Sequence, residues 1–281
     1  MSDRPLRTAL LQGKRRPRRS GSGSPTLARG DGYEFVEVRD YVIGDDPRRI
    51  DWASTARSGS LQTRVILEDI ALTLAAILDD SASMRVGQRT ELRSAGLDAV
   101  RAWYDAAAPD DRCVRIDAQQ VFSPPQLRGR RAAQACAELQ AAAAFSLPGA
   151  LNVARAVLPR GAALLAVADA YDLADDDALL SEIGSRYDAT ILLARDPWYD
   201  AMPLRGLNRI ADAETGATST IYFGAKQREA FLQAIREREM NLAQRFERAG
   251  WRVGTLHERN GADSLYAAFG IASSHAEPVE A

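Results

Sequence analysis

From residue 70 onwards the chain alternates between short apolar runs and longer amphipathic segments. The first run, residues 70–78 (IALTLAAIL), is almost continuously apolar, which is typical of a strand covered on both faces. Repeated strand–helix alternation predicts a mainly parallel sheet with helices on both sides. We therefore expect an α/β fold with a doubly wound, mainly parallel sheet of the Rossmann-like type and an N-terminal extension.

The positions of the expected elements follow from hydrophobic periodicity and from helix-ending residues such as Gly250. Strands are expected at residues 70–78, 113–116, 121–122, 162–168, 189–194 and 251–256. Helices are expected at residues 90–107, 149–158, 175–187, 223–248 and 262–271. The stretch around Asp212 and Gly216 is expected to form a hairpin. We assign residues 69–275 to this domain and residues 276–281 to a tail.

The N-terminal segment is strongly basic. Residues 1–30 contain eight lysine and arginine residues and one aspartate, although the whole chain has a net charge of −2. This composition, rich also in Gly, Ser and Pro, predicts a flexible basic arm over residues 1–28. Such an arm could bind nucleic acid or an anionic surface. It lacks aromatic residues for base stacking, so specific nucleic-acid binding is not expected.

The chain shows no sign of membrane insertion or secretion. No apolar run approaches the about 18 residues of a membrane-spanning helix, and charges interrupt the apolar residues near the N-terminus that a signal peptide would need. A cytoplasmic protein without a membrane span is therefore expected. Cys113 and Cys136 lack metal-ligand spacing. The two histidines, His257 and His275, are too few for a histidine-rich metal site.

A denser segment, residues 29–68, separates the arm from the main domain and is expected to pack on it. Residues 33–38 alternate loosely between apolar and charged side chains, as in a short strand. A helix is expected to follow, with Asp46 as its N-cap and Pro47 at its first position. It should end near Gly59.

Oxygen-bearing side chains follow two of the expected strands. Asp79, Ser81 and Ser83 come directly after the first strand, and Asp169 follows the strand at residues 162–168. Ligands of open α/β sheets bind at the carboxyl ends of the strands. Carboxylates and hydroxyls suit Mg²⁺ or Mn²⁺ and leave room for an acidic ligand from another molecule. The alternative is a purely structural turn, in which these side chains cap backbone groups.

The D-x-S-x-S loop resembles the metal-ion-dependent adhesion site (MIDAS) of von Willebrand factor A domains. A longer and more specific stretch is similar to the signature of the bacterial DUF58 proteins ("domain of unknown function 58"). It comprises Gly30-Asp31-Gly32-Tyr33-Glu34-Phe35, Arg39-Asp40-Tyr41, Gly44-Asp45-Asp46-Pro47-Arg48-Arg49-Ile50-Asp51-Trp52 and Ala56-Arg57. The resemblance implies a von Willebrand factor A-like fold. It also implies partnership with a MoxR-type AAA+ ATPase in complex assembly or chaperone-like activation.

Carried over by position, the resemblance assigns Asp79, Ser81 and Ser83 to the first metal loop and Asp169 to the third. The second loop of such domains usually supplies a threonine. Here Ser146 is the nearest hydroxyl, and its alternative role is to cap the helix that begins near Gly149.

The signature segment concentrates charged side chains. Because an exposed ion pair contributes only about 0–1 kcal/mol, so many charges indicate either partner recognition or a buried ion-pair network. The candidate partner-binding residues are Asp45, Asp46, Arg48, Arg49, Asp51 and Arg57.

We expect a non-enzymatic interaction module, with two alternatives. A metal-dependent hydrolase of the haloacid dehalogenase type would place a D-x-D pair after the first strand, but the residue two after Asp79 is Ser81. The chain also contains neither a P-loop nor a G-x-S-x-G nucleophile elbow. The second alternative is binding of nucleic acid or an anionic surface through the basic arm.

Overall fold

The computed structural model describes residues 5–15, 33–42, 45, 47–68, 71–117, 120–124, 126–138, 145–173, 177–199, 205–213 and 215–272. The chain divides into two compact units. The larger unit comprises Met1–Arg16 and Leu72–Ala281, and the smaller unit comprises Pro17–Ala71. In sequence, the smaller unit is therefore an insertion into the larger one.

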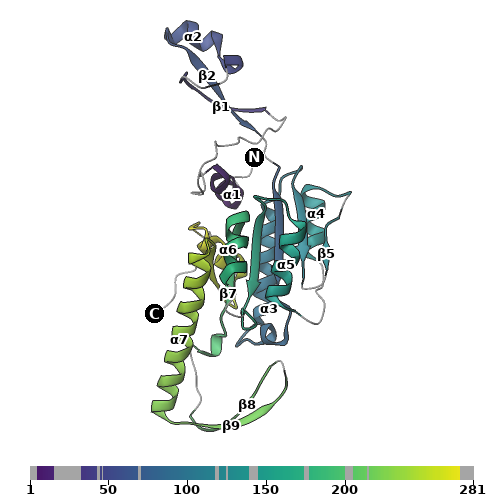
Figure 1. Ribbon diagram of the computed structural model, residues 1–281, viewed down its shortest axis with the longest axis vertical. Coiled ribbons are helices and arrows are strands. Elements are labelled where there is room, and N and C mark those ends of the chain that lie inside the picture. The colour runs from purple at the N-terminus through teal and green to yellow at the C-terminus, as the bar shows by residue number, and fades with distance from the viewer. Residues whose placement is uncertain are drawn as a thin grey trace. The chain divides into compact units, whose positions relative to one another are not determined.

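The larger unit is built around a six-stranded sheet with the strand order β10-β7-β6-β3-β4-β5 (Figure 1). The strands are β3 (Thr73–Leu78), β4 (Arg112–Ile116), β5 (Val121–Phe122), β6 (Ala163–Ala168), β7 (Asp188–Ala194) and β10 (Arg252–Leu256). Every neighbouring pair is parallel except β4 and β5. The mainly parallel sheet expected from the sequence is thus confirmed, and β6 is buried along its whole length.

Helices cover both faces of this sheet (Figure 1). On one face, α3 (Leu92–Asp105) packs against α4 (Gly129–Ala137) and α8 (Gly261–Ala268). On the other, α6 (Asp177–Arg186) packs against α5 (Leu147–Val157) and α7 (Ala225–Arg248). Among the described residues, no helix is both long enough and apolar enough to cross a membrane.

The strand order reverses between β3 and β6. These two strands pair directly at the centre of the sheet. The chain continues from β3 to β4 on one side and from β6 to β7 on the other. A crevice at the carboxyl ends of β3 and β6 is therefore where a ligand of such a sheet is expected to bind.

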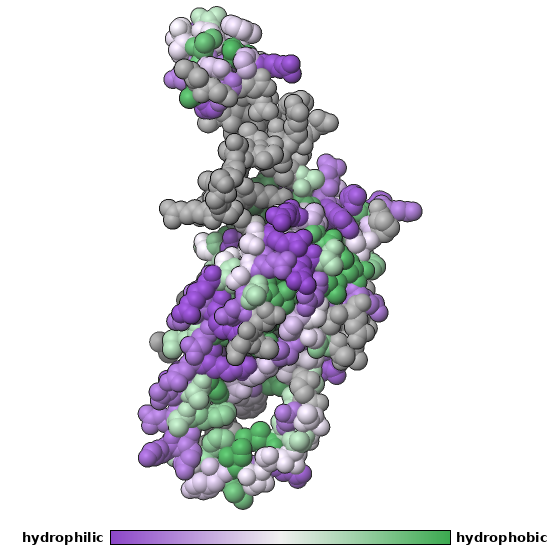
Figure 2. Space-filling view, viewed as in Figure 1, coloured by the Kyte–Doolittle hydropathy of each residue, from purple (hydrophilic) through white to green (hydrophobic). Residues whose placement is uncertain are grey.

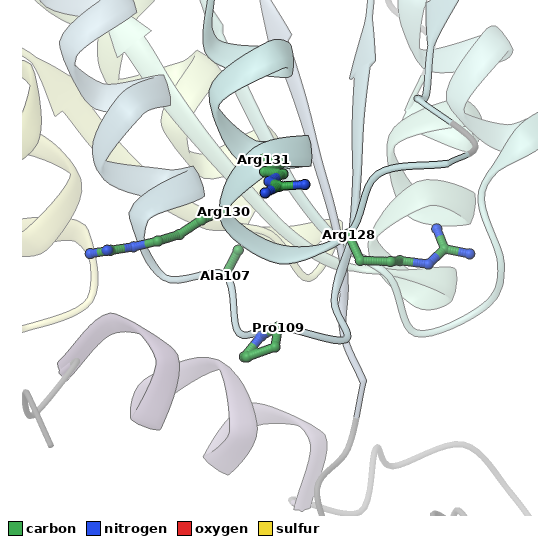
Figure 3. Close-up of a pocket in the computed structure, with 5 residues that line it drawn as sticks. All are labelled: Ala107, Pro109, Arg128, Arg130 and Arg131. Carbon is green, nitrogen blue, oxygen red and sulfur yellow. The ribbon is translucent and has the colours of Figure 1, made fainter.

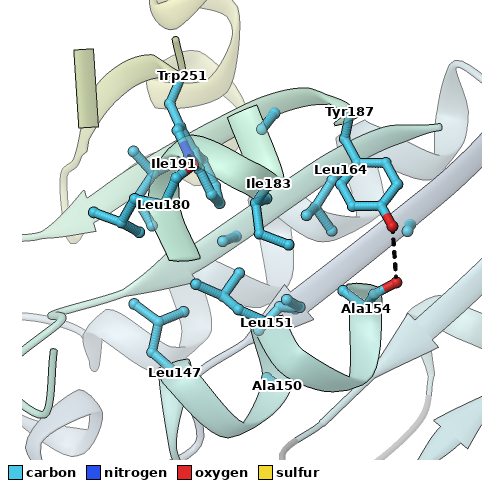
Figure 4. Packing of buried hydrophobic residues seen from close by; sticks show 14 of the residues in the cluster. Leu147, Ala150, Leu151, Ala154, Leu164, Leu180, Ile183, Tyr187, Ile191 and Trp251 are labelled. Atoms are coloured by element: carbon cyan, nitrogen blue, oxygen red, sulfur yellow. Dashed lines mark hydrogen bonds between the residues drawn. The ribbon is translucent and has the colours of Figure 1, made fainter. Parts of the chain in front are cut away.

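A cluster of buried apolar side chains fills the layer between the sheet, α5 and α6 (Figure 4). The polar groups that enter this layer are hydrogen-bonded to backbone carbonyls. The Tyr187 hydroxyl donates to Ala154 over 3.2 Å, and the Trp251 indole N–H donates to Leu180 over 2.9 Å. Such satisfied packing fixes the ends of the strands, because buried polar groups without partners would be costly.

Part of the N-terminal arm is ordered as a helix. α1 (Pro5–Arg15) buries the side chains of Leu6 and Leu10 in the larger unit. Residues 5–15 therefore form a docked helix rather than the flexible arm expected over residues 1–28. The rest of that arm lies outside the described residues.

A buried aspartate connects α1 with the start of the sheet. Asp111 forms an ion pair with Arg7 of α1. The same carboxylate accepts hydrogen bonds from the backbone N–H groups of Leu72 and Ala108, each over 2.7 Å. Asp111 thus holds α1 beside the point at which the chain enters β3.

β8 (Gly206–Ala211) and β9 (Thr218–Phe223) form an antiparallel hairpin outside the central sheet. The Asp212 carboxylate accepts a hydrogen bond from the Thr215 N–H over 2.7 Å, so the expected hairpin is confirmed. Phe223, at the end of β9, packs edge-on against Phe231 of α7. The hairpin and the first turns of α7 extend beyond the end of the sheet (Figure 1).

The smaller unit contains β1 (Tyr33–Asp40), which pairs antiparallel with β2 (Gln62–Glu68). Its helix begins later than expected. Pro47–Arg49 form a short 3₁₀ turn (η1), and α2 runs over Trp52–Ser58.

The cap of α2 also differs from the expectation. Asp51, rather than Asp46, caps the helix by accepting a hydrogen bond from the Ser54 N–H over 3.0 Å. The end is as expected, since Gly59 adopts a φ of 74°, which favours glycine. The indole of Trp52 is 68% exposed, so this side chain does not anchor the helix.

Candidate metal centre

The candidate centre lies at the carboxyl ends of β3 and β6. Asp79 directly follows β3 and Asp169 directly follows β6. The Asp79 N–H donates to the Val167 carbonyl over 2.8 Å, which extends the strand pairing up to the loop. Because this is the point at which the strand order reverses, the two aspartates occupy the expected ligand position.

A chain of hydrogen bonds joins the four side chains predicted to bind metal. The Asp79 Oδ1 atom accepts from the Ser81 N–H over 2.9 Å. The Oγ atoms of Ser81 and Ser83 are hydrogen-bonded over 2.9 Å. Ser83 then donates to the Asp169 Oδ2 atom over 2.6 Å. The predicted convergence of Asp79, Ser81, Ser83 and Asp169 is therefore present.

The backbone holds each loop in this arrangement. Ser83 lies in a 3₁₀ turn, η2 (Ala82–Arg85), which is anchored by the buried side chain of Met84. In the other loop, Asp169 accepts from the Tyr171 N–H over 2.9 Å. Ala170 between them has a φ of 54°, a left-handed conformation that costs a non-glycine residue about 1–2 kcal/mol. The packing of the loop must offset this strain.

Ser146 is used as a helix cap. It precedes α5, and its Oγ accepts a hydrogen bond from the Gly149 N–H over 3.3 Å. Among the described residues it makes no hydrogen bond to the four-residue network. Its loop is nevertheless tied to the third metal loop, that of Asp169, because Asp172 accepts from the Leu147 N–H over 2.8 Å. The capping alternative accounts for Ser146 as it stands.

The electrostatics of the centre favour a cation. The pKa of Asp79 is raised to about 6, mainly by burial and to a smaller extent by the charge of Asp169, although hydrogen bonds from Ser81 oppose the rise. A raised carboxyl pKa means that the negative form is poorly stabilised by its surroundings. A bound divalent ion would supply the missing positive charge.

The donor set fits Mg²⁺ or Mn²⁺ better than a softer metal. It consists of carboxylate and hydroxyl oxygens, which these ions prefer. Within the described part of the chain, no three His, Cys, Asp or Glu side chains group closely enough to hold a metal. A site here would therefore depend on the two serine hydroxyls.

Asp80 points into a different environment from Asp79. It forms an ion pair with Arg93 of α3. Nearby on β4, Arg115 is only 1% exposed, and its two terminal nitrogens have no hydrogen-bond partner among the described residues. Burial lowers the pKa of Arg115, and the charges of Asp80 and Asp117 act against that shift. These groups form a second charged layer that the sequence analysis did not identify.

Aromatic residues flank the metal loops. The Tyr171 ring is covered by the Arg238 guanidinium, whose carbon lies 3.7 Å from the ring centroid. The Tyr171 and Tyr199 hydroxyls are 3.4 Å apart. Tyr199 packs edge-on against Phe231 of α7. The position of Tyr171, two residues after Asp169, could have placed it near the metal loops from the sequence. Its contact with Arg238 of α7 could not have been predicted in this way.

The charged residues predicted to bind a partner lie in the smaller unit. Asp45 accepts from Arg39 over 2.7 Å and from the Val42 N–H over 3.0 Å, so it closes a turn. Asp51 is a buried helix cap. These contacts give both aspartates a structural role.

Two of the other predicted partner-binding residues lie at the surface of the smaller unit. Arg48 and Arg57 are exposed, and Arg57 donates to the Ser54 hydroxyl over 3.3 Å. Arg49 belongs to the 3₁₀ turn, but its side chain is outside the described part. Asp46 lies outside the described residues.

A hollow of about 280 Å³ at the start of α4 is lined by Ala107, Pro109, Arg128, Arg130 and Arg131 (Figure 3). Figure 3 shows the Arg128 and Arg130 side chains pointing in opposite directions. Because these guanidinium groups do not converge on one point, the hollow is not a candidate anion-binding site.

Comparison with known proteins gives a family but no activity. No curated protein matches this chain. Among solved structures, the chain is similar to an aerotolerance-related membrane protein from Bacteroides fragilis that carries multiple mutations to serine. The identity is 14%, the match covers 70% of this chain and 96% of that chain, and the TM-score is 0.40. This likeness is too distant to support an argument about fold or function.

The family model described as "Protein of unknown function DUF58" matches residues 37–241. The match covers most of the signature segment, the metal loops and most of α7. Because it spans more than half of the chain, the protein belongs to the DUF58 family.

Proposed function

We propose that this protein is a non-enzymatic, metal-dependent protein-interaction module with a von Willebrand factor A-like fold. The observation that carries the proposal is the hydrogen-bonded chain from Asp79 through Ser81 and Ser83 to Asp169. Four oxygen-bearing side chains from two strand ends meet at the position at which open α/β sheets bind ligands. The purely structural alternative accounts for the backbone N–H groups that Asp79 and Asp169 accept, but not for the hydrogen bond from Ser83 to Asp169 that joins the two loops.

The same residues explain how a partner could take part in metal binding. Mg²⁺ and Mn²⁺ prefer six oxygen ligands, and the network offers at most four side chains. When bound, the ion would supply a positive charge with open coordination positions. Asp79, Ser81, Ser83 and Asp169 would hold it through their side-chain oxygens, and water or a partner's Asp or Glu could complete the shell.

The surroundings of the loops suit protein recognition. Tyr171 is 56% exposed beside Asp169, and Trp198 is also exposed. Exposed tyrosine, tryptophan and arginine side chains are typical of the residues that dominate protein interfaces. The DUF58 resemblance suggests a MoxR-type AAA+ ATPase as the partner, with a role in complex assembly or chaperone-like activation.

The first experiment tests the metal. Titration calorimetry with MgCl₂ and MnCl₂ should show binding by the wild type and none by Asp79→Ala or Asp169→Ala. Asp117→Asn is the matched control, because Asp117 is a buried aspartate that follows the neighbouring strand β4. Equal binding by the wild type and both alanine variants would rule out this centre.

The second experiment tests the partner. The purified protein is mixed with the MoxR-type ATPase of the same organism, with Mg²⁺ or with EDTA. We expect association that EDTA and Asp79→Ala both weaken, while Asp117→Asn leaves it unchanged. Association that survives EDTA and Asp79→Ala would contradict a metal-dependent interface and would direct attention to exposed Arg48 and Arg57.

A further inference from the structure

Among the described strands, β9 pairs only with β8, so its other side is a free sheet edge. Residues 218–222 are all exposed, whereas β8 alternates between half-buried and exposed residues. Its sequence, TSTIYF, contains no charged residue and no proline. The register with β8 runs without a bulge. Edge strands normally carry charges, prolines or bulges that prevent pairing with another chain, so β9 is suited to accept a further strand.

The hairpin also exposes apolar side chains. Leu207 of β8 and Tyr222 of β9 stand opposite each other in the register and are 75% and 63% exposed. Ile221, on the other face of β9, is exposed as well. Figure 2 shows an apolar area at the hairpin end of the larger unit. Two-stranded sheets are only marginally stable alone, so added strands would stabilise this hairpin.

We infer that β9 pairs antiparallel with β9 of a second copy of this chain. Residues directly opposite each other in an antiparallel pair lie on the same face. A two-fold axis at Thr220 therefore places Thr220 opposite Thr220 and Thr218 opposite Tyr222. Ser219 then faces Ile221. The result is a four-stranded sheet in the order β8-β9-β9-β8.

The chemistry of β9 favours a copy of itself as the occupant. Thr–Thr pairs and pairs of aromatic with β-branched residues are favourable across antiparallel strands. No like charges meet, because β9 has none. A strongly charged strand, by contrast, would find no opposite charge on β9.

The size of the edge limits the affinity. Six residues at about 3.4 Å each make a strand about 20 Å long. Such an edge buries less than the about 1,200 Å² that stable interfaces need. The dimer is therefore weak and concentration-dependent. It needs no metal, so it is independent of the proposed metal centre.

The test is sedimentation velocity on the full chain over a concentration series, in EDTA. Thr220→Lys places two ammonium groups opposite each other at the axis and should weaken association at least about 10-fold. Thr220→Glu should do the same. An equimolar mixture of the two variants should restore association, because opposite charges then meet at the axis. Ala211→Lys, which adds the same charge on β8, is the matched control and should leave association unchanged.

Circular dichroism checks that each variant is folded. A wild type that stays monomeric up to its highest soluble concentration overturns the inference. So does a wild-type dimer that Thr220→Lys leaves intact, or a mixture of the Lys and Glu variants that associates no better than either alone. Loss of the dimer in Ala211→Lys, with none in Thr220→Lys, would place the contact on β8 instead.

Discussion

The Ser83 hydroxyl donates a hydrogen bond of 2.6 Å to the Asp169 carboxylate, although 86 positions separate the two residues in sequence. This contact is what joins the loop after β3 to the loop after β6. The two loops are thus held together without a metal ion, so the ligands of the proposed centre are pre-positioned. A pre-positioned site binds with a smaller entropic cost than one that must be assembled.

Asp79 should make the stability of the metal-free protein fall as the pH rises. Its pKa is about 6 in the folded protein, above the usual 3.8. The folded state therefore binds the proton more tightly than the unfolded state, and this contribution is present below about pH 4 and lost by about pH 6. The shift corresponds to about 2–3 kcal/mol.

Asp79→Asn should remove that pH dependence. Urea unfolding in EDTA between pH 4 and pH 7 measures the free energy of unfolding of both proteins. The variant should gain stability relative to the wild type as the pH rises. Parallel pH curves for the wild type and Asp79→Asn would mean that Asp79 is not buried as a poorly stabilised carboxylate.

Ser146→Ala should lower the stability without changing the affinity for Mg²⁺. The serine caps α5, and loss of an N-cap costs about 1 kcal/mol. Ser146→Asn should retain most of the stability, because asparagine is also a good cap. Urea unfolding and calorimetry give the two quantities. A large loss of Mg²⁺ affinity in both variants would instead make Ser146 a metal ligand.

In the smaller unit, Asp51→Ala should loosen α2 and Trp52→Ala should not. Asp51 is a buried cap, so its loss should cost about 1 kcal/mol. The exposed Trp52 should change stability by less than about 0.5 kcal/mol. Hydrogen exchange of the amides in α2, followed by mass spectrometry, distinguishes them. Faster exchange in Trp52→Ala than in Asp51→Ala would show that the indole is docked.

Arg115→Met should leave the protein as stable as the wild type or make it more stable, because burying a charge without hydrogen-bond partners is costly. The guanidinium is buried without hydrogen-bond partners at its two terminal nitrogens among the described residues. Arg93→Met is the contrast, since it removes the partner of Asp80 and should destabilise. Thermal unfolding compares the two. Strong destabilisation by Arg115→Met would reveal a partner for this charge.

The sequence predicted the sheet and the metal loops well because local signals coincide there with the fold. The apolar runs that become β3 and β6 are buried on both faces, and Asp79 and Asp169 stand at their ends. A residue at the end of a strand can be predicted from the local apolar run alone, without knowing which distant residues it contacts. The same reasoning could not find the Tyr171–Arg238 contact, which depends on how α7 packs.

The predictions for α1, α4 and the cap of α2 were wrong or missing because tertiary contacts outweigh local sequence patterns there. Leu6 and Leu10 are four residues apart, a helical spacing, but the surrounding arginines indicated a solvated arm. α4 was not predicted because it buries mainly small side chains, such as Ala132 and Ala133, which give little periodicity. Asp46 and Asp51 both fit a helix start, and only the backbone decides between them.

The position of Asp111 has a thermodynamic consequence for the inserted unit. Arg7 and Leu72, which flank Pro17–Ala71 in sequence, both bind its carboxylate. Docking of α1 therefore closes a loop of that length, at an entropic cost of about 3–4 kcal/mol if the loop is unfolded. Folding of the smaller unit removes much of that chain freedom in advance. The two units are thus energetically linked through loop closure, and unfolding of the smaller one should loosen α1.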